Sequence, residues 1–211
     1  IWSGLGTDVT GVLDGVAVPW NALRQNPEFR MRVADWAQKW LFNDGALTPQ
    51  PCYDRYKALA DVVAPAIPGE SARWGDQATS APYTLDTWET TRDYILNTYM
   101  PQRTAVVLQQ LKDAGLYPTF DPPTMNLNGA AKHGGTFLPG DVVSLAASAG
   151  TIYWTTNGTD PRPLGGGAPT PAQAYTGPLT LQRGTHVKAR LYLNNAWSAL
   201  NEATFYVDLA P

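Results

Sequence analysis

Apolar positions in the first half of the chain recur with the period of an α-helix. Asn26 followed by Pro27 is typical of a helix start, because Asn caps free backbone N–H groups and Pro suits the first helical position. The sequence Asn43-Asp44-Gly45 is typical of a helix end. Between them, large apolar residues follow at offsets of 0, 4, 7 and 11: Phe29, Val33, Trp36 and Trp40. We expect this helical face to lie in the core.

The same pattern predicts three further helices. Thr48-Pro49 starts a helix whose apolar stripe is Cys52, Tyr56, Leu59 and Val63. The segment 83–115 contains two helices, bent before Pro101 and stopped at Gly115. Four helices with apolar faces predict a small helical bundle, with residues 1–18 as an irregular lead-in.

After about residue 119 the apolar period changes from 3.6 to 2. In "THVKARLYL" Val187, Ala189, Leu191 and Leu193 should face inward, with His186, Lys188, Arg190 and Tyr192 facing outward. In "EATFYVDL" the inward set is Ala203, Phe205 and Val207. Short alternating strands separated by Gly and Pro turns predict an immunoglobulin- or fibronectin-like β-sandwich. The fold class is therefore α+β in two domains, 1–118 helical and 119–211 sandwich, joined by a stiff spacer around "YPTFDPPT".

The segment "IYWTTNGTDPRPLGGG" combines a strand with turn residues. Ile152 and Trp154 should point to one side of the strand and Tyr153 and Thr155 to the other. Asn157-Gly158 suits the positive φ angles of a hairpin turn, and the Asp160 carboxylate can accept backbone N–H bonds. The segment is thus interpreted as a structural turn.

A second structural motif is "ESARWGD". Glu70 and Arg73 are three residues apart, so on a helix they can face one another beside Trp74. We expect a buried ion pair that organises the bundle; substrate binding is the alternative.

Composition and charge exclude several classes of function. The chain has 15 Lys and Arg against 18 Asp and Glu, a net charge of −3, and no basic cluster of the kind that binds nucleic acid. No apolar run approaches the length of a membrane span. Cys52 is the single cysteine, so neither an internal disulfide nor a cysteine-based zinc site can form.

No motif in the sequence indicates catalysis. The acidic residues include no pair that the context marks for glycoside hydrolysis, and His133 and His186 are isolated from metal ligands and from a nucleophile motif. We therefore predict a non-enzyme without catalytic residues, cofactor or metal. A sugar-binding surface is the alternative, because the sandwich aromatics can offer ring faces: Tyr153, Tyr192, Trp197 and Tyr206.

Two groups of phrases carry a family resemblance. "LRQNPEFRMRVADWAQKWLFNDGALTPQ", "ESARWGD" and "YMPQRTAVVLQQLKDAGLYP" resemble the distal region of bacterial exported proteins of the CotH kinase-like family, over roughly 1–118. "GTIYWTTNGTDPR", "AYTGPLTL" and "THVKARLYLNNAWSA" resemble the chitobiase C-terminal or fibronectin-type-III-associated module, which commonly follows a CotH-like region.

The resemblance implies an exported or cell-surface bacterial protein. CotH-like proteins resemble atypical kinases, yet this chain has only Asp14 in "LDGV", with neither a metal-binding Asp cluster nor a P-loop. The nucleotide site would then lie upstream of Ile1, and the chain itself should bind no ATP. We expect a non-catalytic portion acting in surface assembly or adhesion, whose partners are the upstream polypeptide, other surface subunits or a polysaccharide. A carbohydrate-binding module and an accessory part of an atypical kinase are the alternatives.

Overall fold

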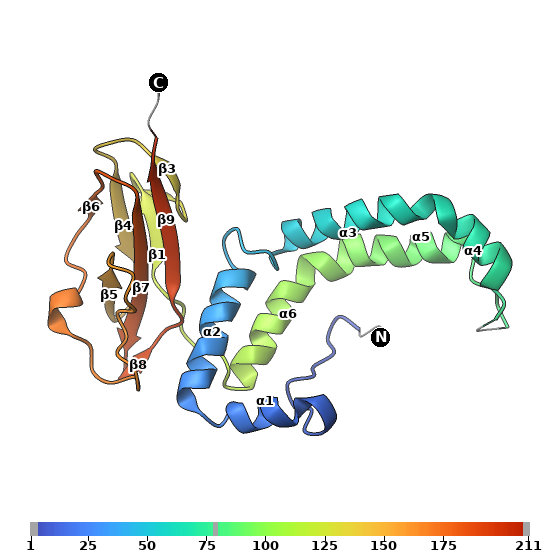
Figure 1. Ribbon diagram of the computed structural model, residues 1–211, viewed down its shortest axis with the longest axis horizontal. Coiled ribbons are helices and arrows are strands. Elements are labelled where there is room, and N and C mark those ends of the chain that lie inside the picture. The colour runs from blue at the N-terminus through green and yellow to red at the C-terminus, as the bar shows by residue number, and fades with distance from the viewer. Residues whose placement is uncertain (1–3, 78–79, 209–211) are drawn as a thin grey trace.

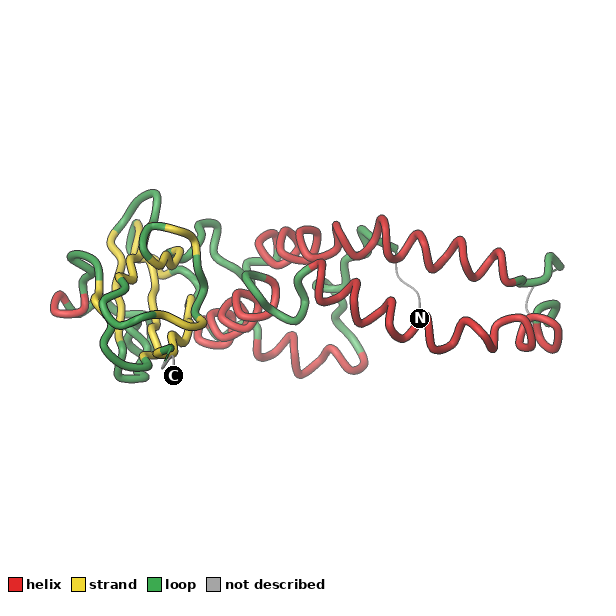
Figure 2. The backbone as a smooth tube through the Cα atoms, turned by 90° about the horizontal axis from the view of Figure 1, so that it is seen from above, coloured by secondary structure: helices red, strands yellow, loops and turns green. Residues whose placement is uncertain are grey.

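The computed structural model describes residues 4–77 and 80–208, and it consists of a helical part followed by a β-sandwich. The predicted fold class, α+β in two parts, is confirmed. Seen from two directions, the molecule is elongated, with the sandwich at one end and paired helices extending toward the other (Figures 1 and 2).

Six α-helices form the helical part within the described residues. Their bounds are α1 Val18–Leu23, α2 Pro27–Leu41, α3 Pro49–Val63, α4 Ile67–Trp74, α5 Leu85–Tyr94 and α6 Met100–Asp113. Single 3₁₀ turns at Gly15–Ala17 and Ala64–Ala66 precede α1 and α4. The four longest helices, α2, α3, α5 and α6, lie where the apolar period predicted them. Helix α3 packs along α6, and together with α4 and α5 they form the arm (Figure 1).

The bend predicted before Pro101 takes the form of a π-helical turn. Helix α5 continues into α6 through Ile95–Tyr99, where the N–H of Met100 donates to the carbonyl of Ile95. Proline has no N–H and its ring clashes with the carbonyl four residues earlier, so a regular α-helix cannot pass through this position without adjustment. The wider turn accommodates Pro101 and changes the direction of the helix.

The sandwich consists of two sheets that enclose a common core. Its strands are β1 Thr124–Leu127, β2 Ala130–Ala131, β3 Gly135–Phe137, β4 Val142–Ala146, β5 Thr151–Thr155, β6 Leu179–Thr180, β7 Thr185–Leu193, β8 Ala196–Trp197 and β9 Asn201–Val207. One sheet has the order β2-β1-β4-β6 and the other β3-β9-β7-β5, with β8 paired to β7. Pairing is antiparallel except between β3 and β9. The predicted inward residues Val187, Ala189 and Phe205 are fully buried in the core.

The predicted core face of α2 is wrong at its two tryptophans. Trp36 is 51% exposed and Trp40 is also exposed, whereas Ala34, Ala37 and Leu41 are buried. The helix thus buries its alanine-rich face, which packs with Tyr117 and Ala199 in a second core. Small side chains allow the helix to approach its neighbours closely, so this face and not the bulkier one is covered.

The stripe predicted on α3 is also partly wrong. Tyr56 and Cys52 are half-buried, but Leu59 is 69% exposed and Val63 is exposed as well. The buried position between them is Ala60. Helix α3 therefore covers a narrow face against α6 and leaves an apolar face without a partner among the described residues.

Candidate functional site

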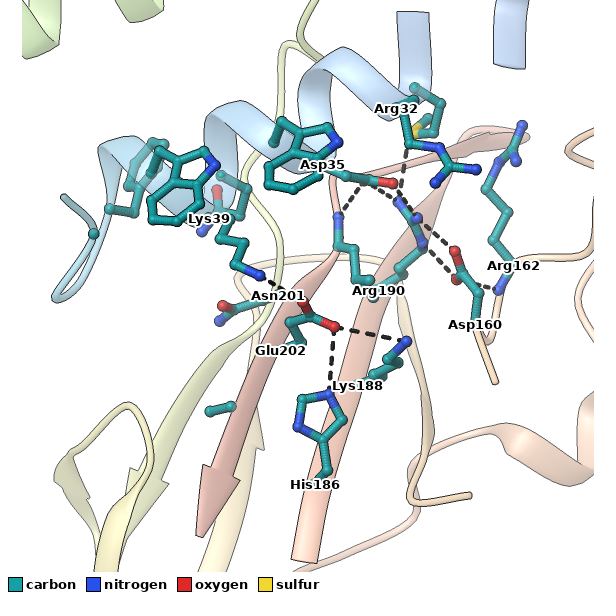
Figure 3. Close-up of a pocket in the computed structure, with 18 of the residues that line it drawn as sticks. Arg32, Asp35, Lys39, Asp160, Arg162, His186, Lys188, Arg190, Asn201 and Glu202 are labelled. Atoms are coloured by element: carbon teal, nitrogen blue, oxygen red, sulfur yellow. Dashed lines mark hydrogen bonds and ion pairs between the residues drawn. The ribbon is translucent and has the colours of Figure 1, made fainter. Parts of the chain in front are cut away.

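A cleft of about 1010 Å³ lies between α2 and the outer face of the β3-β9-β7-β5 sheet. Figure 3 shows α2 crossing above strands β7 and β9, with charged side chains from both sides meeting in the gap. Side chains of β7 and β9 reach this face because successive residues of a strand alternate between its two sides. The face predicted to point into solvent is therefore covered in part by a helix.

Arg190 of β7 fixes α2 to the sheet. Its guanidinium is 1% exposed and donates to both Asp35 Oδ atoms of α2, at 2.8 and 2.7 Å, and to both Asp160 Oδ atoms, at 2.7 and 2.6 Å (Figure 3). Asp35 also accepts the backbone N–H of Leu200 at 2.8 Å, and Arg190 donates to the carbonyl of Ser198 at 2.8 Å. Two bidentate carboxylates satisfy a buried cation that would otherwise be strongly unfavourable. We call Arg190, Asp35 and Asp160 the clamp.

A second ion pair lies beside the clamp. Arg162 donates to both carboxylate oxygens of Glu28 in the first turn of α2, at 2.9 and 2.5 Å, and the N–H of Gly165 donates to the same carboxylate at 3.1 Å. The Arg162 Nε is buried and has no hydrogen-bond partner among the described residues. The loop after β5 thereby holds both the start and the middle of α2.

These contacts lower the pKa of two carboxylates, that of Glu28 on α2 and that of Asp160 in the loop after β5. For Glu28, the hydrogen bond from Arg162 is the main cause, and it outweighs the opposite effect of burial. For Asp160, burial alone would raise the pKa, but the hydrogen bonds and positive charge of Arg190, with the N–H and charge of Arg162, lower it overall. Both groups are therefore held in their charged forms.

The segment "IYWTTNGTDPRPLGGG" is a docking loop and not a hairpin. After β5 the chain crosses to β6 in the opposite sheet before returning to pair β7 with β5. Gly158 has the predicted positive φ, of 84°, but Asn157 does not; its side chain instead accepts from Thr159 N at 3.0 Å. Asp160 accepts the predicted backbone bond, from Arg162 N at 2.9 Å, and in addition binds Arg190. The sequence offered no signal for that last contact.

A second group of charges surrounds Glu202 in the cleft. Its carboxylate lies 3.9 Å from Lys39 Nζ of α2, 3.6 Å from Lys188 Nζ and 3.3 Å from His186 Nε2 of β7 (Figure 3). Lys188 and Glu202 are register partners on β7 and β9, so the strands themselves bring them together. Unlike the buried Arg190, the three cations around Glu202 are all partly exposed, so each single contact contributes little to stability.

Exposed aromatic rings also line the cleft. Trp36 and Trp40 are one helical turn apart on α2, with ring centroids 5.9 Å apart and planes 10° from parallel. Lys39 Nζ lies 5.4 and 5.5 Å from the two centroids, within the range of a cation–π contact. Tyr206 lines the cleft from β9 and is 59% exposed. Because their helical spacing predicted a core position, Trp36 and Trp40 were not among the residues predicted to contact a ligand.

Three of the four predicted sugar-contacting residues form a separate cluster. Tyr153, Tyr192 and Trp197 contact one another, with ring centroids 4.9 to 6.3 Å apart. Trp197 is only 4% exposed, and its Nε1 donates to Gly167 O at 3.1 Å. This buried ring has no free face for a ligand. Of the four, only Tyr206 lines the cleft.

The motif "ESARWGD" is on the surface at the far end of the arm. Glu70, Arg73 and Trp74 of α4 are all exposed, so the predicted buried Glu–Arg pair is wrong. Arg73 instead lies over the Trp74 ring, 4.8 Å from its centroid. Helix α4 packs mainly on α5, and its surroundings leave this turn in solvent.

No group of three or more His, Cys, Asp or Glu side chains within 4–77 and 80–208 is arranged to hold a metal ion. Among the helices of these same residues, none has the length and apolar character needed to cross a membrane.

The fold and the cleft define a class: a β-sandwich module rigidly attached to a helical segment, with a groove where they meet. Residues 143–203 match the family model described as Fn3 associated. The match supports a fibronectin-associated β-module, which suggests a non-catalytic accessory role for this part of the chain. Arg190, Asp160 and Arg162 lie inside the matched stretch, whereas Asp35 and Glu28 lie outside it. Comparison with curated proteins and with solved structures finds no match.

Proposed function

We propose that this chain is a non-catalytic portion of an exported bacterial CotH-like protein and that it acts in surface assembly or adhesion. The Fn3-associated match over 143–203 supports an accessory module, and the resemblance of the helical half supports the CotH-like parent. The role is that of a rigid connector which presents one surface to a protein partner.

The observation that carries the proposal is the apolar face of the arm. On α3, Leu59 is 69% and Val62 78% exposed, and Val63 next to them is also exposed. Trp74 on α4 and Tyr94 on α5 add exposed rings to the same arm. Leu59, Val62 and Val63 are spaced by three and four residues and so share one face of α3, and exposed apolar surface of this kind marks protein-interaction sites. The partner is another part of the same polypeptide or another surface subunit.

Site-specific photo-cross-linking tests this proposal. A photoreactive residue is placed at Val62 in the full protein displayed by its source bacterium, and cross-linked peptides are identified by mass spectrometry. Asp61 is the matched control, because it is exposed, lies about 100° around the helix axis from Val62, and pairs with Lys57 at 2.7 Å. We expect cross-links from position 62 to a defined segment of the same polypeptide or of a surface protein. Equal yields from positions 61 and 62 would contradict the proposal.

A further inference from the structure

The geometry points to a carbohydrate-binding site in the cleft between α2 and the outer face of the β3-β9-β7-β5 sheet, with Trp36 and Trp40 as its stacking platform and a neutral oligosaccharide as its ligand. This site is independent of the proposed docking face on the arm, because it uses none of the arm's residues.

The two tryptophans of α2 are unusually exposed for their size and apolar character. Trp36 is half exposed and Trp40 more than a third, although both are large and apolar. They line a cleft whose volume lies at the upper end of the range for ligand sites. Lys39 Nζ lies over both rings, 5.4 and 5.5 Å from their centroids, so the indole faces turned away from Lys39 are the flat apolar surface that the C–H face of a sugar ring packs against. Tyr206 adds a third exposed ring from β9.

The positive and negative charges that line the cleft are balanced. Its charged lining residues are five cations and five anions: Arg32, Lys39, Arg162, Lys188, Arg190, Glu28, Asp35, Asp44, Asp160 and Glu202. Phosphate-bearing ligands need concentrated positive charge, so this lining does not suit a nucleotide or a nucleic acid. Eight of these groups bind one another, whereas Arg32 and Asp44 are exposed and have no hydrogen bond or ion pair with the described residues, so these two can bind the hydroxyl groups of a neutral sugar.

The strands that form the floor of the cleft lie inside the sheet and not at its edge. A peptide that binds a sheet usually adds to a free edge through main-chain hydrogen bonds. Here the floor is made of β7 and β9, and each is paired on both sides, β9 with β3 and β7, and β7 with β9 and β5. Strand β7 pairs with β9 over Thr185–Ala189 and with β5 over Lys188–Tyr192, and β9 pairs with β3 over Phe205–Val207, so neither strand offers a continuous free edge to an added peptide strand. Recognition must rely on side chains, through stacking and polar contacts, as it does for sugars.

Ion pairs hold the two sides of the cleft, α2 and the sheet, in a fixed arrangement. The clamp, Arg190 with Asp35 and Asp160, holds α2 at a fixed position over the sheet, and Lys39 reaches across to Glu202. A preformed cleft binds its ligand without an ordering cost in the protein. Trp36 and Trp40 lie on this clamped helix, so their rings are held in place for stacking.

The test is binding of the 211-residue chain to an array of neutral and acidic glycans, followed by isothermal titration with the best-bound oligosaccharide. We expect a neutral oligosaccharide to bind, and its affinity to fall at least about tenfold in Trp36→Ala and in Trp40→Ala. The matched control is Tyr83→Ala, which removes an exposed aromatic ring just before α5, outside the cleft and outside the proposed docking face. Its affinity should stay within about twofold of wild type. Thermal unfolding of each variant confirms that the fold is retained.

Four outcomes would overturn the inference. The first is an array on which no neutral glycan binds above background. The second is affinity that survives both Trp36→Ala and Trp40→Ala. The third is affinity that falls in Tyr192→Ala instead, which would place the site on the aromatic cluster of β5, β7 and β8. The fourth is a preference for acidic glycans over neutral ones, which would contradict the charge argument.

Discussion

At the scale of single residues, Arg190 is the side chain on which the joining of the two parts depends. It extends from the outward face of β7, and its neighbours along the strand on that face, Lys188 and Tyr192, remain partly exposed. Arg190 alone is fully enclosed, by one carboxylate from α2 and one from the loop after β5. Such a buried cation is favourable only while both partners remain in place.

Arg190→Ala should destabilise the protein by about 3–5 kcal/mol, because it leaves Asp35 and Asp160 as partly buried charges without a partner. Urea unfolding followed by circular dichroism measures the change. Arg183→Ala is the control, since Arg183 is exposed on the turn before the same strand, and it should change stability by less than about 0.5 kcal/mol. Similar stabilities for the two variants would show that the clamp is not important for folding.

The carboxylates around the clamp should make stability depend on acid pH. The pKa values of Asp160 and Glu28 are lowered in the folded protein, so their contribution is fully present above their ordinary pKa of about 4. It is lost as the pH falls below that value through their lowered pKa values. We expect the melting temperature of wild type to fall more steeply between pH 4 and pH 2 than that of the Asp160→Asn, Glu28→Gln variant. Parallel curves would contradict this.

At the scale of elements, the turns of the sandwich depend on two kinds of glycine. Gly150 precedes β5 with φ of 78°, and a Cβ there would lie 2.7 Å from the carbonyl oxygen of Tyr192. Gly158 in the docking loop has φ of 84°, but a Cβ there would meet no atom within 4 Å. The two positions share the backbone conformation that disfavours other residues and differ in the space around them.

Gly158→Ala should therefore cost about 1 kcal/mol, from the left-handed backbone alone. Gly150→Ala should cost about 2–4 kcal/mol, because it adds a clash with the β7 backbone to the same conformational penalty. Chemical denaturation of the two variants side by side separates the terms. If the two costs are equal, the β5–β7 contact is more adaptable than the structure indicates.

At the scale of the whole molecule, the clamp, the Glu28–Arg162 pair, the Lys39–Glu202 contact and a small second core join the sandwich to the helices. The second core includes Ala34 and Leu41 of α2, Tyr117 of the connecting segment and Ala199 of the sandwich. Burial raises the pKa of Tyr117, whose hydroxyl donates to the buried Gln38 of α2. The buried Tyr117 thus anchors the connection on α2, and the two parts should unfold together.

Removing the α2 carboxylates of the clamp and of the Glu28–Arg162 pair should separate the unfolding of the helical part from that of the sandwich. In a Glu28→Ala, Asp35→Ala variant we expect scanning calorimetry to show two transitions where wild type shows one, because the coupling between the parts is lost while the sandwich core is intact. Asp54→Ala, Asp61→Ala is the control, since it removes two exposed carboxylates from α3. A single unshifted transition in the first variant would mean that the second core is sufficient to couple the parts.

Local features determined the elements. The Asn26 side chain accepts from Glu28 N at 2.8 Å, as its place before Pro27 predicted, and the alternation in "THVKARLYL" placed Val187 and Ala189 in the core. Caps, prolines and apolar periods act through the backbone of a few neighbouring residues, so a sequence displays them directly. Two residues of the candidate site can be predicted from local patterns: Asp160 from its place in a turn, and Tyr206 from its place on the outward face of an alternating strand.

Only the tertiary structure decided which faces meet. Arg190 on an alternating strand has the same sequence pattern whether it faces water or a helix, and its partner Asp35 is 155 residues away. Helix α2 carries two apolar faces, and the closer packing of Ala34 and Ala37 left Trp36 and Trp40 exposed. Long-range contacts select among faces that local patterns leave equivalent, and the cleft exists because of that selection.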